Sequence, residues 1–261
     1  MISAAQLAAM AATVLLSIGF PVVLLILWRR RTHAPFAAAA VGAGIFLVFA
    51  LVLEQLLHAL VLRPGGYVMQ HAWAYVLYGA LGAGVFEETG RYVGFRFLLK
   101  KHSGRETGVM YGIGHGGIEA VLVAGVTAAA NLIAAVQYNS GALAAGSAYE
   151  KAGQAIAATP AALLAVSGVE RVIAVCFHIA LSVLVFEAVK RPGKGWLYPL
   201  AIALHAGLDV FAALYQAGVL TSIWVVELAV ALFTAAVAWY AVRLYRADVP
   251  AAAAAGPEAA R

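Results

Sequence analysis

Long apolar stretches, each near the length of a membrane-spanning helix, follow one another along the 261-residue chain. A transmembrane helix needs about 20 consecutive, mostly apolar residues. Seven stretches meet this requirement, with short polar segments between them: Leu7–Trp28, Phe36–Leu62, Ala72–Leu99, Gly108–Val136, Val169–Val189, Trp196–Ala217 and Ser222–Leu244. The pattern therefore predicts an all-α, polytopic membrane helix bundle with about seven transmembrane helices.

One segment between the predicted spans is longer than the others. Tyr138–Gly168 is rich in Ala and Gly and carries Glu150 and Lys151. We expect a loop here that contains a short interfacial or re-entrant helix, because an eighth span would move every later loop to the other side. The chain is thus predicted as one transmembrane domain, residues 1–246, followed by a flexible cytoplasmic tail, residues 247–261.

The composition excludes several classes of protein. Apolar residues make up 64% of the chain and charged residues only 11%, whereas a soluble domain has about 25% charged residues. Too few polar side chains are present to cover a soluble surface, so a soluble enzyme, a disordered protein and a nucleic-acid-binding domain are all excluded. The single cysteine, Cys176, excludes a disulfide framework.

Basic residues concentrate in alternate loops. Only Arg63 and Lys151 fall in the opposite loops. The excess of basic residues on cytoplasmic loops predicts an outer N-terminus and a cytoplasmic C-terminus in the plasma membrane. The net charge of +5 then indicates contact with anionic lipid, and nucleic acid is not implied. The clusters that set this orientation are Arg29–Arg31, Arg96, Lys100, Lys101, Arg105, Lys190, Arg191, Lys194, Arg243 and Arg246.

Many ionisable residues nevertheless fall inside the apolar stretches, where each costs about 2.5–3.5 kcal/mol on insertion scales. Counted inward from the cytoplasmic ends at about 1.5 Å per residue, most of them lie at one depth on four helices. A shared depth indicates one polar layer, on the cytoplasmic side of the midplane. The full set is Glu54, His58, Glu87, Glu88, Arg91, His115, Glu119, His178, Glu187, His205, Asp209 and Glu227.

Within this layer, three pairs are spaced four residues apart, so that each pair shares one face of its helix. The pairs are Glu87 with Arg91, His115 with Glu119, and His205 with Asp209. Each pair alone is compatible with structural ion pairing. Their joint occurrence at one depth favours a functional site. Glu54, His58 and Glu187 lie outside the layer or lack a partner in it, so structural pairing is favoured for them.

Four sequence motifs resemble the YhfC family of intramembrane proteases. They are Phe86-Glu87-Glu88-Thr89-Gly90-Arg91, Gly112-Ile113-Gly114-His115-Gly116-Gly117-Ile118-Glu119-Ala120, the single His178, and His205-Ala206-Gly207-Leu208-Asp209. That family is grouped with the type II CAAX prenyl-endopeptidases, the bacteriocin-processing membrane proteases, the PrsW proteases and APH-1. The resemblance implies a bacterial membrane hydrolase that cleaves a membrane protein or peptide, and the depth of the polar layer predicts a site open to the cytoplasmic side.

Peptide hydrolysis needs a water, a base and donors for the oxyanion. We expect Glu87, or as second choice Glu88, to activate the water. His115 would orient that water, with Glu119 setting the tautomer of His115. Arg91 would align the second carboxylate.

The remaining residues would act on the developing charge. His205 and Asp209, together with His178, are expected to stabilise the oxyanion or protonate the leaving amine. A metal-dependent version is the second hypothesis, in which His115, His178, His205 and a glutamate hold Zn²⁺ with water in the open position.

Two other classes of function stay open. A non-catalytic scaffold, as APH-1 is understood to be, would use the polar layer for assembly with a membrane-protein partner. A proton-coupled transporter would use the same residues as a proton relay.

Overall fold

The computed structural model describes residues 1–248 and confirms an all-α helix bundle. Every regular element in these residues is helical, and π-helical segments interrupt several of the long helices. The helices are α1 (Ala4–Val14), α2 (Phe20–Thr32), α3 (Phe36–Val48), α4 (Gln55–Val61), α5 (Tyr67–Gln70), α6 (Ala72–Val93), α7 (Glu106–Ala120), α8 (Val126–Asn139), α9 (Ala148–Ala158), α10 (Ala161–Lys190), α11 (Leu197–Gln216) and α12 (Ile223–Ala247); the π-helical segments are Leu15–Gly19, Phe49–Glu54, Gly94–Leu98 and Val121–Gly125.

Six continuous helices are long and apolar enough to cross a membrane, and they correspond to six of the seven predicted spans. The remaining predicted span, Ala72–Leu99, forms α6 and the π-helical turn after it. This helix has the length of a span, but it carries Glu87, Glu88 and Arg91, which lower its apolar character. The chain is therefore a multi-pass membrane helix bundle in which the most polar long helix is also the one that carries the double glutamate.

The segment between the fourth and fifth spans differs from the prediction at one end. A short helix does occur there, α9. However, α10 begins at Ala161 rather than near Val169, with Pro160 at its N-cap position. Alanine and leucine, which follow Pro160, are strong helix formers, and we had assigned them to the loop. The earlier start places Arg171 inside a long helix.

The C-terminal boundary lies slightly later than predicted. Helix α12 continues to Ala247, and Arg191 donates two hydrogen bonds of 2.6 Å to the Asp248 carboxylate. The rest of the predicted tail lies outside the described residues.

The basic clusters meet at one end of the bundle, formed by residues 28–36, 98–106, 190–197 and 243–248, which we call the basic end. Trp28 Nε1 donates to the Glu106 carbonyl at 3.1 Å, Arg105 to the Tyr245 carbonyl at 2.9 Å, and Lys190 to the Leu99 carbonyl at 2.8 Å. Beneath these contacts the Phe95 ring packs on Tyr111 and Phe186, with centroids 4.5 and 5.5 Å apart. Large buried rings thus pack against the basic end.

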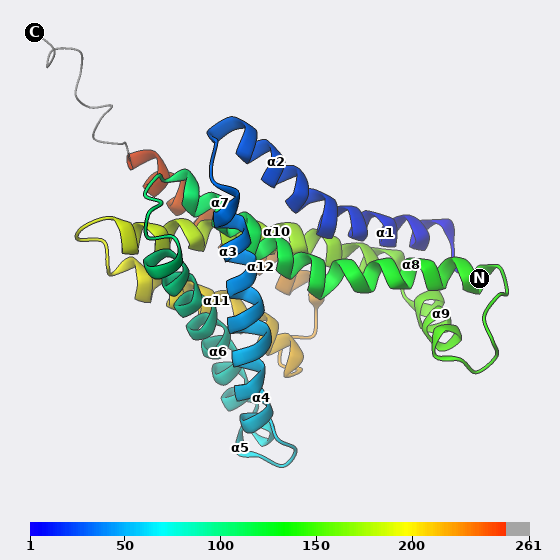
Figure 1. Cartoon of the computed structure of the whole chain (residues 1–261). Coiled ribbons are helices and arrows are strands. Elements are labelled where there is room, and N and C mark those ends of the chain that lie inside the picture. The colour runs from blue at the N-terminus through cyan, green and yellow to red at the C-terminus, as the bar shows by residue number, and fades with distance from the viewer. Residues whose placement is uncertain (249–261) are drawn as a thin grey trace, which may run out of the picture.

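From the basic end the helices run in two directions (Figure 1). Helices α1 and α8 pack together and extend toward the N-terminus and α9, whereas α3, α4, α6 and α11 extend toward α5. We call the α5 end, residues 62–71 and 216–223, the far end. It is tied together by a 2.8 Å hydrogen bond from Tyr75 to the Gln216 side chain.

The outer surface of the bundle is apolar. Leu56 and Leu60 on α4, and Leu228 and Leu232 on α12, are 60–68% exposed. Such exposed leucines, spaced four apart on one helix face, match a surface whose solvent is lipid rather than water.

Two glycines of α7 allow its neighbours to approach closely. A Cβ on Gly114 would lie 2.0 Å from the Ala39 carbonyl oxygen of α3, and one on Gly112 would lie 2.5 Å from Cα of Ile179 on α10. Small residues permit this backbone approach between membrane helices. They bring α10, and with it His178, against the face of α7.

Candidate active site and metal-binding group

Three buried side chains from three helices converge on one point. Glu87 comes from α6, His115 from α7 and His178 from α10. Nε2 of His115 lies 2.9 Å from Oε2 of Glu87, and Nδ1 of His178 lies 3.8 Å from the same oxygen. One potential ligand atom from each residue falls within 4.8 Å of the other two.

Hydrogen bonds fix the tautomer of His178. Arg91 Nη2 donates to Nδ1 of His178 at 3.0 Å, and a guanidinium is a donor only. Nδ1 therefore carries no hydrogen, and the Nε2–H group faces Glu119, which it contacts directly. The lone pair of Nδ1 is directed toward the cluster.

The side chain of Glu119 contacts other residues than the one we expected. We had expected it to orient His115 from one turn away, but it contacts His178 and accepts a 2.8 Å hydrogen bond from Arg171 Nη1. Both partners of Glu119 lie on α10, because the helix–helix packing turns this carboxylate away from its own helix. Nδ1 of His115 is buried and has no hydrogen-bond partner within residues 1–248.

The second glutamate, Glu88, lies in a different environment. Its side chain is 0% exposed and contacts the Arg91 guanidinium, three residues along the same helix. His205 Nδ1 lies 2.7 Å from the same carboxylate. Arg91, which shares the i, i+4 spacing with Glu87, thus forms its ion pair with Glu88, the carboxylate that we expected it to align.

His205 lies beside the cluster rather than in it. One ring nitrogen faces Glu88, and the other lies 3.5 Å from Oδ2 of Asp209, one turn further along α11. The His178 and His205 rings are 5.5 Å apart. The predicted metal set was His115, His178, His205 and a glutamate. The group in the structure contains His115, His178 and Glu87 but not His205, because the His205 ring contacts Glu88 instead.

The donor set of the cluster fits a metal ion. Two imidazoles and one carboxylate, with a fourth position for water, are a known catalytic zinc site. The deprotonated Nδ1 of His178 and the hydrogen bond from its other nitrogen to a carboxylate match the usual ligand form of histidine. Since Arg91 occupies the same Nδ1, a metal at His178 would replace that contact.

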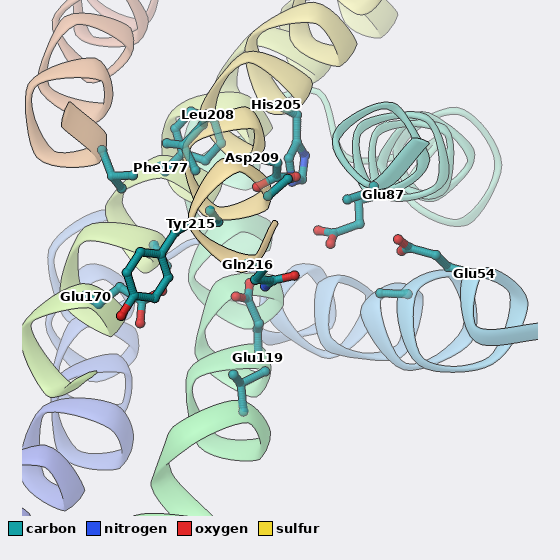
Figure 2. A pocket seen from close by; sticks show the side chains of 18 of the residues that line it. Glu54, Glu87, Glu119, Glu170, Phe177, His205, Leu208, Asp209, Tyr215 and Gln216 are labelled. Atoms are coloured by element: carbon teal, nitrogen blue, oxygen red, sulfur yellow. The ribbon is translucent and has the colours of Figure 1, made fainter. Parts of the chain in front are cut away.

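A cavity of about 680 Å³ reaches the cluster. Its inner wall includes Glu87, Glu119, His178, His205 and Asp209, several of which Figure 2 shows around one space. Glu87 thus faces the cavity, whereas the fully buried Glu88 is held between Arg91 and His205.

The cavity leads away from the basic end. Its lining includes Leu62, Tyr75, Gln216 and Ile223, which stand at helix ends of the far end. We had predicted an opening to the cytoplasmic side, where the basic residues lie. The residues that line this cavity run instead from the cluster to the far end.

Several residues that line the cavity are not among the site residues predicted from the sequence. Arg171 lies within the predicted span Val169–Val189 but is not among the predicted site residues. Its spacing of seven from His178 places the two on one face of α10 and was the available signal. Glu54, expected to be structural, and Glu227, to which no role was given, both line the cavity.

The comparisons with known proteins agree with the resemblance. Residues 13–230 match the YhfC intramembrane metalloprotease family. The uncharacterized membrane protein YhfC of Bacillus subtilis (strain 168) is 35% identical over 236 residues, which cover 87% of this chain and 91% of the relative. No solved structure matches the chain. The family match spans every helix of the cluster, and the chain belongs to the YhfC intramembrane metalloprotease family.

Proposed function

We propose that this protein is an intramembrane endopeptidase whose centre is Glu87, His115 and His178. The observation that carries the proposal is the convergence of these three ligand atoms within 4.8 Å at the inner end of a cavity. The substrate would be a membrane protein or a membrane-associated peptide, because the exposed flanks of the bundle are apolar.

Glu87, His115 and His178 are the residues that would hold the metal, and Zn²⁺ suits their chemistry. Such an ion supplies Lewis acidity to the scissile carbonyl and to the attacking water. Glu119 keeps the Nε2 proton of His178, and Arg171 keeps Glu119 ionised and in place through its 2.8 Å hydrogen bond. A glutamate-type reaction without metal would use Glu87 as the base toward the same water.

Between the two glutamates, the surroundings favour Glu87 for contact with water. It faces the cavity, whereas the Glu88 side chain is fully buried and contacts Arg91 and His205 through one oxygen. Glu88 and Arg91 would then be positioning residues for α6 and His205. His205, with Asp209 at 3.5 Å, lies on the cavity wall, where it would protonate the leaving amine.

In the orientation that the basic residues predict, the far end faces the outside of the cell. We therefore propose that water and the scissile segment reach the centre from the outer side, through the cavity that ends at Gln216 and Ile223. A scaffold that uses its polar residues only for assembly has no need of such a cavity. A transporter needs a path that opens on both sides of the membrane, whereas the lining of this cavity runs from the centre to the far end.

The test combines metal content with cleavage. The purified chain in proteoliposomes is expected to contain about one zinc per chain and to cleave a co-reconstituted membrane substrate. His115→Ala and Glu87→Gln should each remove cleavage, and His115→Ala should also remove the metal. Glu150→Gln on α9, outside the cavity lining, is the control and should change neither.

Two outcomes separate the alternatives. Cleavage that survives exhaustive chelation but is lost in Glu87→Gln would favour the metal-free reaction. Cleavage that survives both Glu87→Gln and His115→Ala would overturn the proposed centre.

A further inference from the structure

The cavity wall is strongly acidic outside the proposed centre. Within the described residues, six carboxylates line the cavity, five of them outside the centre, and its one guanidinium belongs to Arg171. Arg171 is already paired, with Glu119 at 2.8 Å and with Glu170 in direct contact. Glu54, Asp209 and Glu227 are therefore left facing the cavity without a permanent cation.

Glu54 is the most buried of these three carboxylates and forms no hydrogen bond in the described structure. Its side chain is only 7% exposed, and its nearest ionisable partner is Nε2 of His58 at 3.4 Å, a contact that does not form a hydrogen bond in the described structure. Nδ1 of His58 is engaged by the Tyr78 hydroxyl at 2.8 Å. Figure 2 shows the Glu54 side chain pointing into the same space as Glu87 and Asp209. A buried carboxylate without a full set of hydrogen bonds is costly, so such a group indicates a missing partner.

The other two carboxylates repeat this feature from different helices. Oδ2 of Asp209 on α11 and Oε2 of Glu227 on α12 are both buried without a hydrogen-bond partner in residues 1–248. Three helices thus each present an incompletely paired carboxylate to one cavity. We call Glu54, Asp209 and Glu227 the acidic wall.

The acidic wall lies between the centre and the far end. Phe46 packs on His115, with ring centroids 5.3 Å apart, and Glu54 comes eight residues later on the same continuous helix, about 12 Å toward the far end at 1.5 Å per residue. Phe233 of α12 packs near Phe177, which in turn contacts His205. Glu227 precedes Phe233 by six residues, about 9 Å in the same direction.

Resting on the proposed function, we infer that the acidic wall binds a lysine or arginine side chain of the substrate. An ammonium or guanidinium group supplies hydrogen-bond donors and positive charge together, which the three carboxylates lack. An extended peptide advances about 3.3 Å per residue, so the basic residue would lie within about three residues of the cleaved bond, on the side toward the far end. The protease would thus select peptide segments by charge, although its outer surface is apolar.

The test measures binding separately from cleavage. The full chain carrying Glu87→Gln, in nanodiscs, is titrated with fluorescent apolar dodecapeptides that differ at one position: lysine, norleucine or glutamate. We expect the lysine peptide to bind about tenfold more tightly than the norleucine peptide, the gain from one charge-assisted hydrogen bond, and the glutamate peptide to bind most weakly. Moving the lysine along the peptide should locate one preferred position.

Variants then assign the preference to the wall. Adding Glu54→Gln and Glu227→Gln should reduce the lysine preference to less than about twofold, since both charges are removed. Glu150→Gln changes the net charge of the chain in the same way as either single replacement and should leave the preference intact. If the double replacement fails to fold, Glu54→Gln and Glu227→Gln are added singly, and each should reduce the lysine preference.

The two proposals can fail separately. Equal binding of the lysine and norleucine peptides, or a lysine preference that survives the double replacement, overturns the acidic wall. If the chain binds the lysine peptide selectively but cleaves nothing, the inference about the acidic wall stands and the proposed protease function is wrong. If the unmodified chain cleaves substrates without any preference for lysine, the protease function stands and the inference about the acidic wall is wrong.

Discussion

The imidazole of His178 contacts the carboxylate of Glu119 through Nε2, so that its other nitrogen is left free of hydrogen on the side of Glu87. The contact joins α10 to α7, and Arg171 donates to the same carboxylate at 2.8 Å. A carboxylate behind a ligating histidine fixes its tautomer and raises its basicity.

Replacing Glu119 should therefore weaken the centre without removing a ligand. We expect Glu119→Gln to lower metal affinity and cleavage by about 10–100-fold, the usual cost of losing such a partner. Arg171→Met should have a smaller effect, because Glu119 keeps its contact with His178. Zinc titration of the apo chain measures the affinity, and an unchanged affinity in Glu119→Gln would contradict the assignment. Glu150→Gln serves as the matched control.

Replacing the two adjacent glutamates should have different effects, one on cleavage and the other on stability. Glu87→Gln is expected to abolish cleavage with little change in the free energy of unfolding. Arg91→Met and Glu88→Gln should each cost about 3–5 kcal/mol, because each leaves a buried charge without its partner. The double replacement should cost less than the sum of the two. Unfolding of the four chains in mixed micelles measures the coupling, and additive costs would mean that the buried pair is not a unit.

The length of the apolar stretches was enough to predict the helix bundle. The length of each apolar stretch predicts a helix of about the same length. Six of the helices in the structure are long and apolar enough to span a membrane. The start of α10 was missed because an Ala-rich segment after Pro160 is compatible with either a loop or a helix.

Within the site, contacts along one helix were easier to predict than contacts between helices. The i, i+4 spacing correctly places Asp209 one turn from His205, at 3.5 Å. The partner of Glu119 could not be predicted in this way, because it depends on how α7 and α10 are rotated against each other. That rotation follows from the close approach at Gly112, which periodicity within one helix does not report.

The ion pair at the C-terminal end of α12 gives a prediction for pH. Hydrogen bonds from Arg191 to both Asp248 oxygens hold the pKa of Asp248 below its usual value. The stabilisation is then complete above the unfolded pKa of about 4 and is lost as the pH falls through the lower folded pKa. The Tm difference between the unmodified chain and Asp248→Asn should be constant from pH 7 to 5 and shrink below about pH 4. A difference independent of pH would show that the charge of Asp248 contributes nothing.

The glycines of α7 should be the least replaceable small residues in the bundle. Gly114→Ala would place a methyl group 2.0 Å from the Ala39 carbonyl oxygen, so α3 and α7 must separate, at a cost of about 1–3 kcal/mol or more. The same change in α6 at Gly79, where no atom lies within 4 Å of the new Cβ, should be neutral or stabilise by up to about 1 kcal/mol through helix propensity. Because moving α7 also moves His115, Gly114→Ala should weaken zinc binding, whereas Gly79→Ala should not. Thermal unfolding and zinc titration of both variants test this, and equal behaviour of the two would contradict the close packing of α3 on α7.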